Sequence, residues 1–164
     1  MQKKKLVLGL VAFAVVAVGW SLFRPERLFV NTTVNEGFAD AATAKAAAQA
    51  PVLLSQGTFH KGAHETAGTA SIFQTPDGKR VLRLTDFMTS NGPDVQVYLV
   101  AANDALDNDT VTKSGFVHVG ALKGNIGDQN YELPAGVDLA KHRAVTIWCR
   151  RFGVNFGTAP LTLS

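Results

Sequence analysis

Two patterns of hydrophobic and polar residues divide the chain. Eighteen residues without a charge run from Leu6 to Phe23, and the lysines at positions 3–5 precede them. A helix of this length spans roughly 27 Å, close to the ~30 Å hydrocarbon core of a bilayer. From residue 52 onward, short runs with apolar residues at every second position alternate with turn residues. The first pattern predicts a membrane-spanning helix, and the second predicts a domain of β-strands.

The lysines set the orientation that we predict for the helix. Positive charge favours the cytoplasmic side, so the N-terminus is expected in the cytoplasm and everything after Phe23 outside it. A cleaved signal peptide has the same positive start, but its apolar region is only about 7 to 15 residues long and ends at small residues. Here the run ends in SLFRPERLF, which is bulky and charged. We predict a retained single-pass anchor in the cell membrane over residues 1–23, with a cleaved signal as the alternative.

Residues 24–51 form the connection between this anchor and the rest of the chain. They end in the alanine-rich stretch ADAATAKAAAQAP. Alanine favours helix, but almost no large apolar side chains are present with which the stretch could dock. We therefore predict a tether, either a frayed helix or a flexible spacer. Whether Phe29 and Val30 pack on the membrane surface or on the domain stays open.

The body, residues 52–164, has the pattern of an all-β domain. Runs such as GTASIFQT, KRVLRLTDF and AVTIWCRRF are separated by turn sequences, for example PDG at 76–78 and NGPD at 91–94. We count about eight candidate strands, and no long segment has helical apolar periodicity. Regular short strands between glycine, proline and aspartate predict an antiparallel β-sandwich or a barrel-like domain.

The charge distribution argues against nucleic acid as a partner. The net charge is +3, but residues 52–164 hold ten basic and ten acidic side chains, so the excess belongs to residues 1–51. A nucleic-acid-binding fold needs clustered positive charge on the folded body. The G-x-S-x-G, P-loop and H-E-x-x-H motifs are also missing from the sequence. An electron carrier or a binding module is therefore predicted in preference to an enzyme.

The single cysteine, Cys149, is the first candidate for chemistry. Period-two alternation places it on the same apolar face as Val145 and Ile147. It is either a small buried hydrophobe or a reactive thiol, because oxidising compartments tend to pair or remove free cysteines. As a thiolate it could bind haem iron, cycle through sulfenic acid or join two chains. Arg151, on the same side, would favour the thiolate in a polar pocket.

His118 is the second candidate. It alternates with Phe116 in a predicted strand, where it is either a partly buried histidine with its hydrogen bonds satisfied or a second axial ligand opposite Cys149. A blue-copper site needs a histidine and a methionine after its cysteine, and neither follows Cys149. The acidic connection 103–109 lacks the glycine and closing glutamate of an EF-hand loop. No metal site is predicted, and we expect the remaining histidines in loops and turns: His60, His64 and His142.

The segment GNIGDQNYELP contains Gly124 and Gly127 in a predicted loop. The geometry of a glycine turn explains this spacing. A polar recognition loop for a ligand or partner is the alternative, with NGPD at 91–94 as its neighbour if the strand ends cluster.

The body also resembles a known family. The order GTF, GTASI, VLRLTDF, NGPDVQVYL, GALKGNIGDQNYELP and VTIWCRRFGVNFG is similar to the DM thirteen domain, also called the electron-transfer domain of that name, over roughly Leu54 to Leu161. That family occurs as a small extracytoplasmic β-rich module, sometimes beside DOMON and membrane-cytochrome domains. The resemblance implies a redox or prosthetic-group role centred on the cysteine of the IWC segment, here Cys149. Haem is the candidate group, and a redox protein of the cell envelope is the implied partner.

Two functions follow from these observations. In the first, the body is a membrane-anchored, extracytoplasmic redox or electron-transfer module that uses Cys149. In the second, it is a non-enzymatic β-sandwich that binds a ligand or a protein at the cell envelope, and Cys149 only fills core volume. Accessibility of the thiol in the folded protein distinguishes them.

Overall fold

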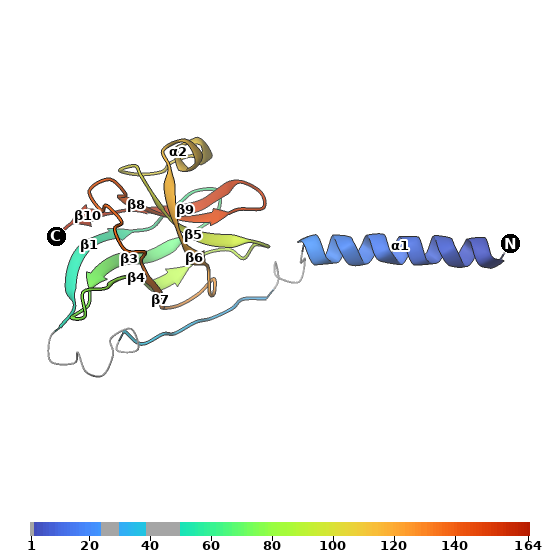
Figure 1. Ribbon diagram of the computed structural model, residues 1–164, viewed down its shortest axis with the longest axis horizontal. Coiled ribbons are helices and arrows are strands. Elements are labelled where there is room, and N and C mark those ends of the chain that lie inside the picture. Colours follow the sequence, from blue (N-terminus) through green and yellow to red (C-terminus); the bar gives the residue numbers. More distant parts are fainter. Residues whose placement is uncertain (1, 24–29, 39–49) are drawn as a thin grey trace.

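The computed structural model describes residues 2–23, 30–38 and 50–164 (Figure 1). Helix α1, Gln2–Phe23, contains the apolar run. Its segment Gln2–Ser21 is long and apolar enough to cross a membrane, and none of the segment is buried against the rest of the described chain. A signal sequence near an N-terminus has the same properties. The helix therefore marks the chain for export or for anchoring in a membrane.

The body is a sandwich of two five-stranded antiparallel sheets, as the spacing of short strands predicted (Figure 1). The predicted strands form, with the last predicted run, NFGTAPLTL, divided into two strands by Leu161. The described residues add one strand of two residues, His60–Lys61, which is too short to show a period of two. The first sheet has the order β10 (Thr162–Leu163), β1 (Val52–Thr58), β3 (Ala67–Gln74), β4 (Arg80–Met88), β7 (Gln129–Glu132). The second has the order β2 (His60–Lys61), β9 (Val154–Pro160), β8 (Ala144–Cys149), β5 (Val95–Val100), β6 (Phe116–Ala121).

Alternation along β8 and β5 fills the space between the sheets. In β8, Val145, Ile147 and Cys149 belong to the main core, whereas Trp148 lies in a smaller cluster on the outer face. All six residues of each of these strands are buried. The outer face is covered because the short helix α2, Asn108–Lys113, packs Val111 onto it. A central strand that is covered on both sides carries few charged residues, and neither β5 nor β8 contains one.

The segment of residues 30–38, which we call the strap, lies along the body. Thr33 forms a parallel bridge with Ile126. The backbone N–H groups of Val34 and Glu36 donate to the carbonyls of Ile126 and Asp128, both at 2.9 Å. We predicted a tether with nothing to dock over residues 24–51, but this part of it docks through backbone groups and through the side chains of Asn31, Glu36 and Phe38. Most of these contacts are polar, so the small number of large apolar side chains in the sequence did not indicate them. Phe29 and the alanine-rich residues 39–49 lie outside the described residues.

Candidate functional site: a cleft beside the strap

Two loops and the strap enclose a cleft of about 480 Å³ at one end of the second sheet. Strand β5 begins and β6 ends at this edge, because Gln96 pairs with Ala121. The NGPD loop before β5 and the GNIG loop after β6 therefore meet. The sequence indicated that these loops would be neighbours only if the strand ends clustered. The lining consists of Val30 and Thr32 from the strap, residues 91–96 and residues 121–125.

The buried side chain of Asn125 joins the walls of the cleft. Its Oδ1 accepts from the backbone N–H of Thr32 at 2.8 Å, and its Nδ2 donates to Asn31 Oδ1 at 3.0 Å and to the carbonyl of Thr89 at 3.1 Å. The residue is only 3% exposed. An unpaired amide is costly at that depth, so these three hydrogen bonds fix both the loop and the strap. Asn91 Nδ2 also donates to the carbonyl of Val30.

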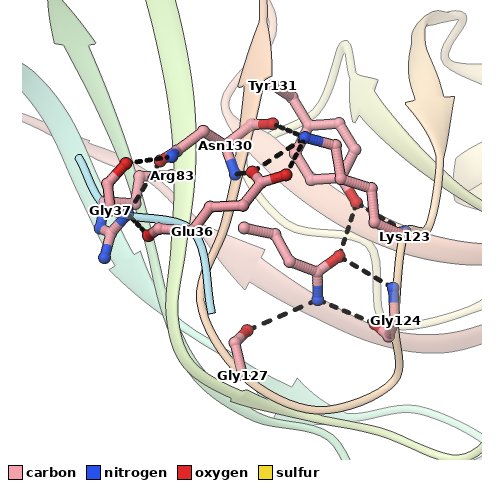
Figure 2. Close-up of polar contacts among 9 residues, drawn as sticks. Glu36, Gly37, Arg83, Lys123, Gly124, Gly127, Asn130 and Tyr131 are labelled. Atoms are coloured by element: carbon pink, nitrogen blue, oxygen red, sulfur yellow. Dashed lines mark hydrogen bonds and ion pairs between the residues drawn. The ribbon is translucent and has the colours of Figure 1, made fainter. Parts of the chain in front are cut away.

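Gln129 sets the shape of the GNIG loop from inside the core. This side chain is 0% exposed; its Nε2 donates to the carbonyl of Gly124 at 2.8 Å, and its Oε1 accepts from Gly124 N and from the hydroxyl of Tyr131. Figure 2 labels two partners of this side chain, Gly124 and Tyr131. Burial raises the pKa of Tyr131, so the hydroxyl stays protonated and remains a donor at neutral pH. The loop is therefore a rigid wall.

The two glycines of the loop make room for the strap. A Cβ atom at Gly124 would lie 2.5 Å from the carbonyl oxygen of Thr32, and one at Gly127 would lie 2.2 Å from that of Val34. Gly127 also has a φ of +95°, which side chains rarely adopt. The glycine turn that the sequence indicated is thus present, and its purpose is close approach of a second backbone.

A cage of donors surrounds the carboxylate of Glu36 in the strap (Figure 2). Lys123 Nζ lies 2.7 and 2.9 Å from its two oxygens, and the backbone N–H of Asn130 donates to it at 2.7 Å. Arg83 donates to the carbonyl of Glu36 at 3.0 Å and pairs with Asp128 at 2.5 Å. Burial opposes ionisation of Glu36, but the hydrogen bonds and the nearby cations outweigh it and lower the pKa of Glu36.

A chain of polar side chains follows the other side of the cleft. His118 Nε2 donates to Gln96 Oε1 at 2.8 Å, since an amide oxygen can only accept, and Gln96 Nε2 donates to Asp94 Oδ1 at 2.6 Å. Arg150 Nε donates to Asp94 Oδ2 at 2.9 Å. The Tyr98 ring and the imidazole of His118 pack nearly perpendicular to each other, with centroids 5.6 Å apart. His118 therefore orients Gln96, which lines the cleft.

Cys149 lies behind the cleft wall and does not line it. Its register partners are Val95 on β5 and Val154 on β9, and its side chain is 0% exposed within the main core. Val95 itself lines the cleft. Cys149 faces the space between the sheets, whereas His118 bonds Gln96 on the outer face of the same sheet. The fold does not bring these two predicted site residues to one ligand.

A haem does not fit against Cys149 in this fold. A thiolate that binds haem iron needs one open side for the macrocycle. The sulfur is enclosed by apolar neighbours of both sheets, and the cleft is lined by other residues. Arg151, which we considered as a cation near the thiol, is exposed in the turn after β8. Nothing polar from that side chain reaches the core.

The remaining histidines and the acidic connection have structural roles. His60 Nε2 lies 2.8 Å from Asp104 Oδ1, and this pair joins β2 to the 101–107 loop. The imidazole of His64 packs on Phe156 with ring centroids 3.9 Å apart. Asp107 caps α2 by accepting from Thr110 N at 2.7 Å. Within the described residues, no group of three or more His, Cys, Asp or Glu side chains is placed to hold a metal ion.

Most of the body matches a known protein family. The model of the family described as electron transfer DM13 matches residues 58–161, which is more than half of the chain. The chain belongs to this family. The match confirms the resemblance seen in the sequence, and it includes both cleft loops and Cys149 but not the strap. No curated protein and no solved structure matches the DM13 chain.

Several residues of this site were not among those that the sequence singled out for chemistry. Glu36, Lys123 and Asn125 build the strap contacts, and Gln96 lines the cleft. The sequence carried one usable signal, the two glycines of GNIG, because such spacing indicates a close approach of backbones. The charged partners gave no signal, since isolated polar residues in loops are common.

Proposed function

We propose that the protein is a membrane-tethered, extracytoplasmic module of the electron-transfer DM13 family that binds a small amphipathic ligand in its cleft. The observation that supports this proposal is the construction of the cleft. Its walls come from three separate segments held by buried, fully paired amides. The volume of about 480 Å³ lies within the range of small-molecule sites.

The lining favours an amphipathic ligand. Asn91, Asp94 and Gln96 supply polar groups, whereas Val95 and Leu122 supply apolar surface. A site with this mixture orients a ligand through its hydrogen bonds and gains affinity from its apolar part. Each polar group is already held by a neighbour, so the cleft is preorganised before a ligand enters.

The connection to α1 keeps the cleft near the membrane if the anchor is retained. Only residues 24–29 separate Phe23 from Val30, which lines the cleft. A fully extended chain covers at most about 3.6 Å per residue, so the cleft lies within roughly 25 Å of the end of the helix. With the N-terminus in the cytoplasm, the cleft faces the outer surface of the cell membrane and the redox proteins of the envelope.

The experiment fills the cleft from an exposed position. Ala121 is exposed at the rim, so Ala121→Phe occludes the cleft without entering the core; Ala135→Phe, at an exposed loop position that does not line the cleft, is the control. Full-length protein is extracted gently from membranes, and bound small molecules are identified by mass spectrometry. We expect one species to accompany the natural protein and Ala135→Phe and to be lost from Ala121→Phe. A natural protein that carries nothing, or equal retention by both variants, would contradict the proposal.

Electron transfer through Cys149 is the second candidate. The family description and the register pairing of Cys149 with the cleft residue Val95 favour it. In this alternative the thiol reacts with a disulfide reagent while the protein is folded. If the sulfur only fills volume, labelling is slow until the protein is denatured. Cys149→Ala then costs about 1 to 2 kcal/mol of stability and keeps the bound species.

A further inference from the structure

The groove that holds the strap is built by the family domain, whereas the strap is not part of it. Every residue that bonds the strap lies between Arg83 and Asn130, inside the matched residues 58–161. The strap, residues 30–38, precedes that range. The domain therefore carries a preformed receptor for a segment that lies outside the family domain.

Recognition of the strap backbone resembles the addition of a strand. The carbonyl of Thr32 accepts from Ile126 N at 3.3 Å, Val34 N donates to the carbonyl of Ile126, and Glu36 N donates to that of Asp128. These bonds have the parallel sense of the single bridge between Thr33 and Ile126, and the glycines of the GNIG loop permit the approach. Added strands gain affinity from such main-chain bonds, and pockets for particular side chains give specificity.

Side-chain recognition is concentrated at the C-terminal half of the strap. The carboxylate of Glu36 receives Lys123 and the Asn130 amide, so charged and backbone donors converge on one anion. Two residues later the Phe38 ring packs on Phe73 with centroids 4.7 Å apart. The groove thus reads a glutamate followed at the second position by an aromatic residue.

We infer that this groove is a reversible peptide-binding site, selective for an extended segment that carries a glutamate, and that residues 30–38 are its resident ligand. Thr33, Asn35 and Gly37 are exposed, so the strap can leave by local opening without disturbing the core. Because Val30 and Thr32 form one wall of the cleft, release of the strap opens the cleft on that side. The groove then accepts the same kind of segment from another chain. This inference stands whether or not the cleft binds a small molecule.

The first experiment measures binding in trans. In the full-length chain, residues 31–38 are replaced by alternating glycine and serine, and a fluorescent peptide of residues 30–38, VNTTVNEGF, is added. We expect this variant to bind the peptide and the natural protein not to bind it, because a ligand in cis has an effective concentration on the order of millimolar. A peptide with glutamine in place of the glutamate is expected to bind roughly ten- to a hundredfold more weakly.

Variants of the receptor sharpen this result. Lys123→Gln, added to the variant chain, is expected to weaken the peptide to the level of the glutamine peptide. Lys79→Gln is the matched control, because Lys79 pairs with Glu132 of β7 at 3.0 Å and has no contact with the strap. Equal binding of the two peptides, or equal effects of the two lysine variants, would overturn the inference.

A second measurement needs no replacement of the strap. In full-length Glu36→Gln, hydrogen exchange of residues 31–38 is compared with the natural protein. We expect exchange roughly ten- to a hundredfold faster in the variant, with unchanged exchange in β5 and β8. A strap that stays equally protected without its glutamate would show that it is a fixed part of the fold, and would overturn the inference.

Discussion

Val95 and Cys149 face one another across strands β5 and β8, and they lie on either side of the boundary between cleft and core. Val95 is 8% exposed, whereas Cys149 is 0% exposed. The NGPD loop closes over this point, since a Cβ atom at Gly92 would lie 2.8 Å from Val95 Cγ2. The size of one valine side chain therefore determines how close the cleft comes to the sulfur.

Val95→Ala is expected to speed the reaction of Cys149 with a thiol reagent. Truncation removes two methyl groups between the cleft and the sulfur, at a cost of about 2 kcal/mol in the free energy of unfolding. Labelling of the folded full-length protein is followed by mass spectrometry. The control is Val145→Ala, which truncates an equally apolar position of the same core that does not line the cleft. Equal labelling rates in variants of equal stability would show that the reagent reaches the sulfur only through general unfolding.

The strands and their faces were readable from the sequence because period-two alternation is a local property. In β8 the alternation placed Cys149 on the apolar face with Ile147, and the structure has both in the main core. Turn residues at 76–78 and 91–94 marked the strand ends correctly. The helix α1 followed from the length of its uncharged run.

The contacts between distant segments could not be read in this way. The bonds from Asn125 to Asn31 and from Lys123 to Glu36 join positions more than 80 residues apart, and a single sequence contains no signal for such pairs. The same limit applies to His118, whose hydrogen bond to Gln96 depends on the pairing of β5 with β6. The contacts that build the site therefore depend on how the strands are arranged in space. The strands themselves could be predicted because they follow from local sequence patterns.

Gly127→Ala is expected to expel the strap. The new Cβ atom would meet the carbonyl of Val34, and the residue would also have to adopt a positive φ. Gly136→Ala provides a matched control, because Gly136 has a φ of +80° but no atom within 4 Å of its Cβ position. Both variants lose about 1 kcal/mol to backbone strain, and only Gly127→Ala adds the clash. Hydrogen exchange of residues 31–38 should rise in Gly127→Ala alone; an equal rise in Gly136→Ala would remove the role assigned to the GNIG glycines.

The His60–Asp104 pair is expected to make stability fall as the pH rises above neutrality. Burial disfavours the charged imidazole, but the hydrogen bond to Asp104 and the carbonyl of Lys61 outweigh it and raise the pKa of His60 above 6.5. A raised pKa contributes stability that is complete below 6.5 and is lost as the pH rises through the value of the folded state. Urea unfolding at about pH 6 and pH 8 measures the effect, and Asp104→Asn should reduce the difference. If the free energy of unfolding changes equally with pH in both proteins, the change comes from other groups.

Acid is expected to release the strap. Because the pKa of Glu36 is lowered, its contribution to docking is present above the ordinary value of 4.5 and is lost as the pH falls through the folded value. Lys123 and Arg83 are the cations that face Glu36, and Asp128, which pairs with Arg83, is the other carboxylate at this place. Hydrogen exchange of residues 31–38, corrected for the intrinsic effect of pH, should rise between about pH 6 and pH 3 in the natural protein.

Two variants separate the carboxylates in this titration. Glu36→Gln should leave the strap loose at every pH, with a flat profile, because the titrating group is gone. Asp128→Asn removes the partner of Arg83 but keeps the contact between Glu36 and Lys123, so hydrogen exchange of the strap should still rise as the pH falls. If instead Asp128→Asn flattens the profile and Glu36→Gln does not, the pair of Arg83 with Asp128 is the titrating contact that holds the strap. The donors around Glu36 would then position the strap without making its docking depend on pH.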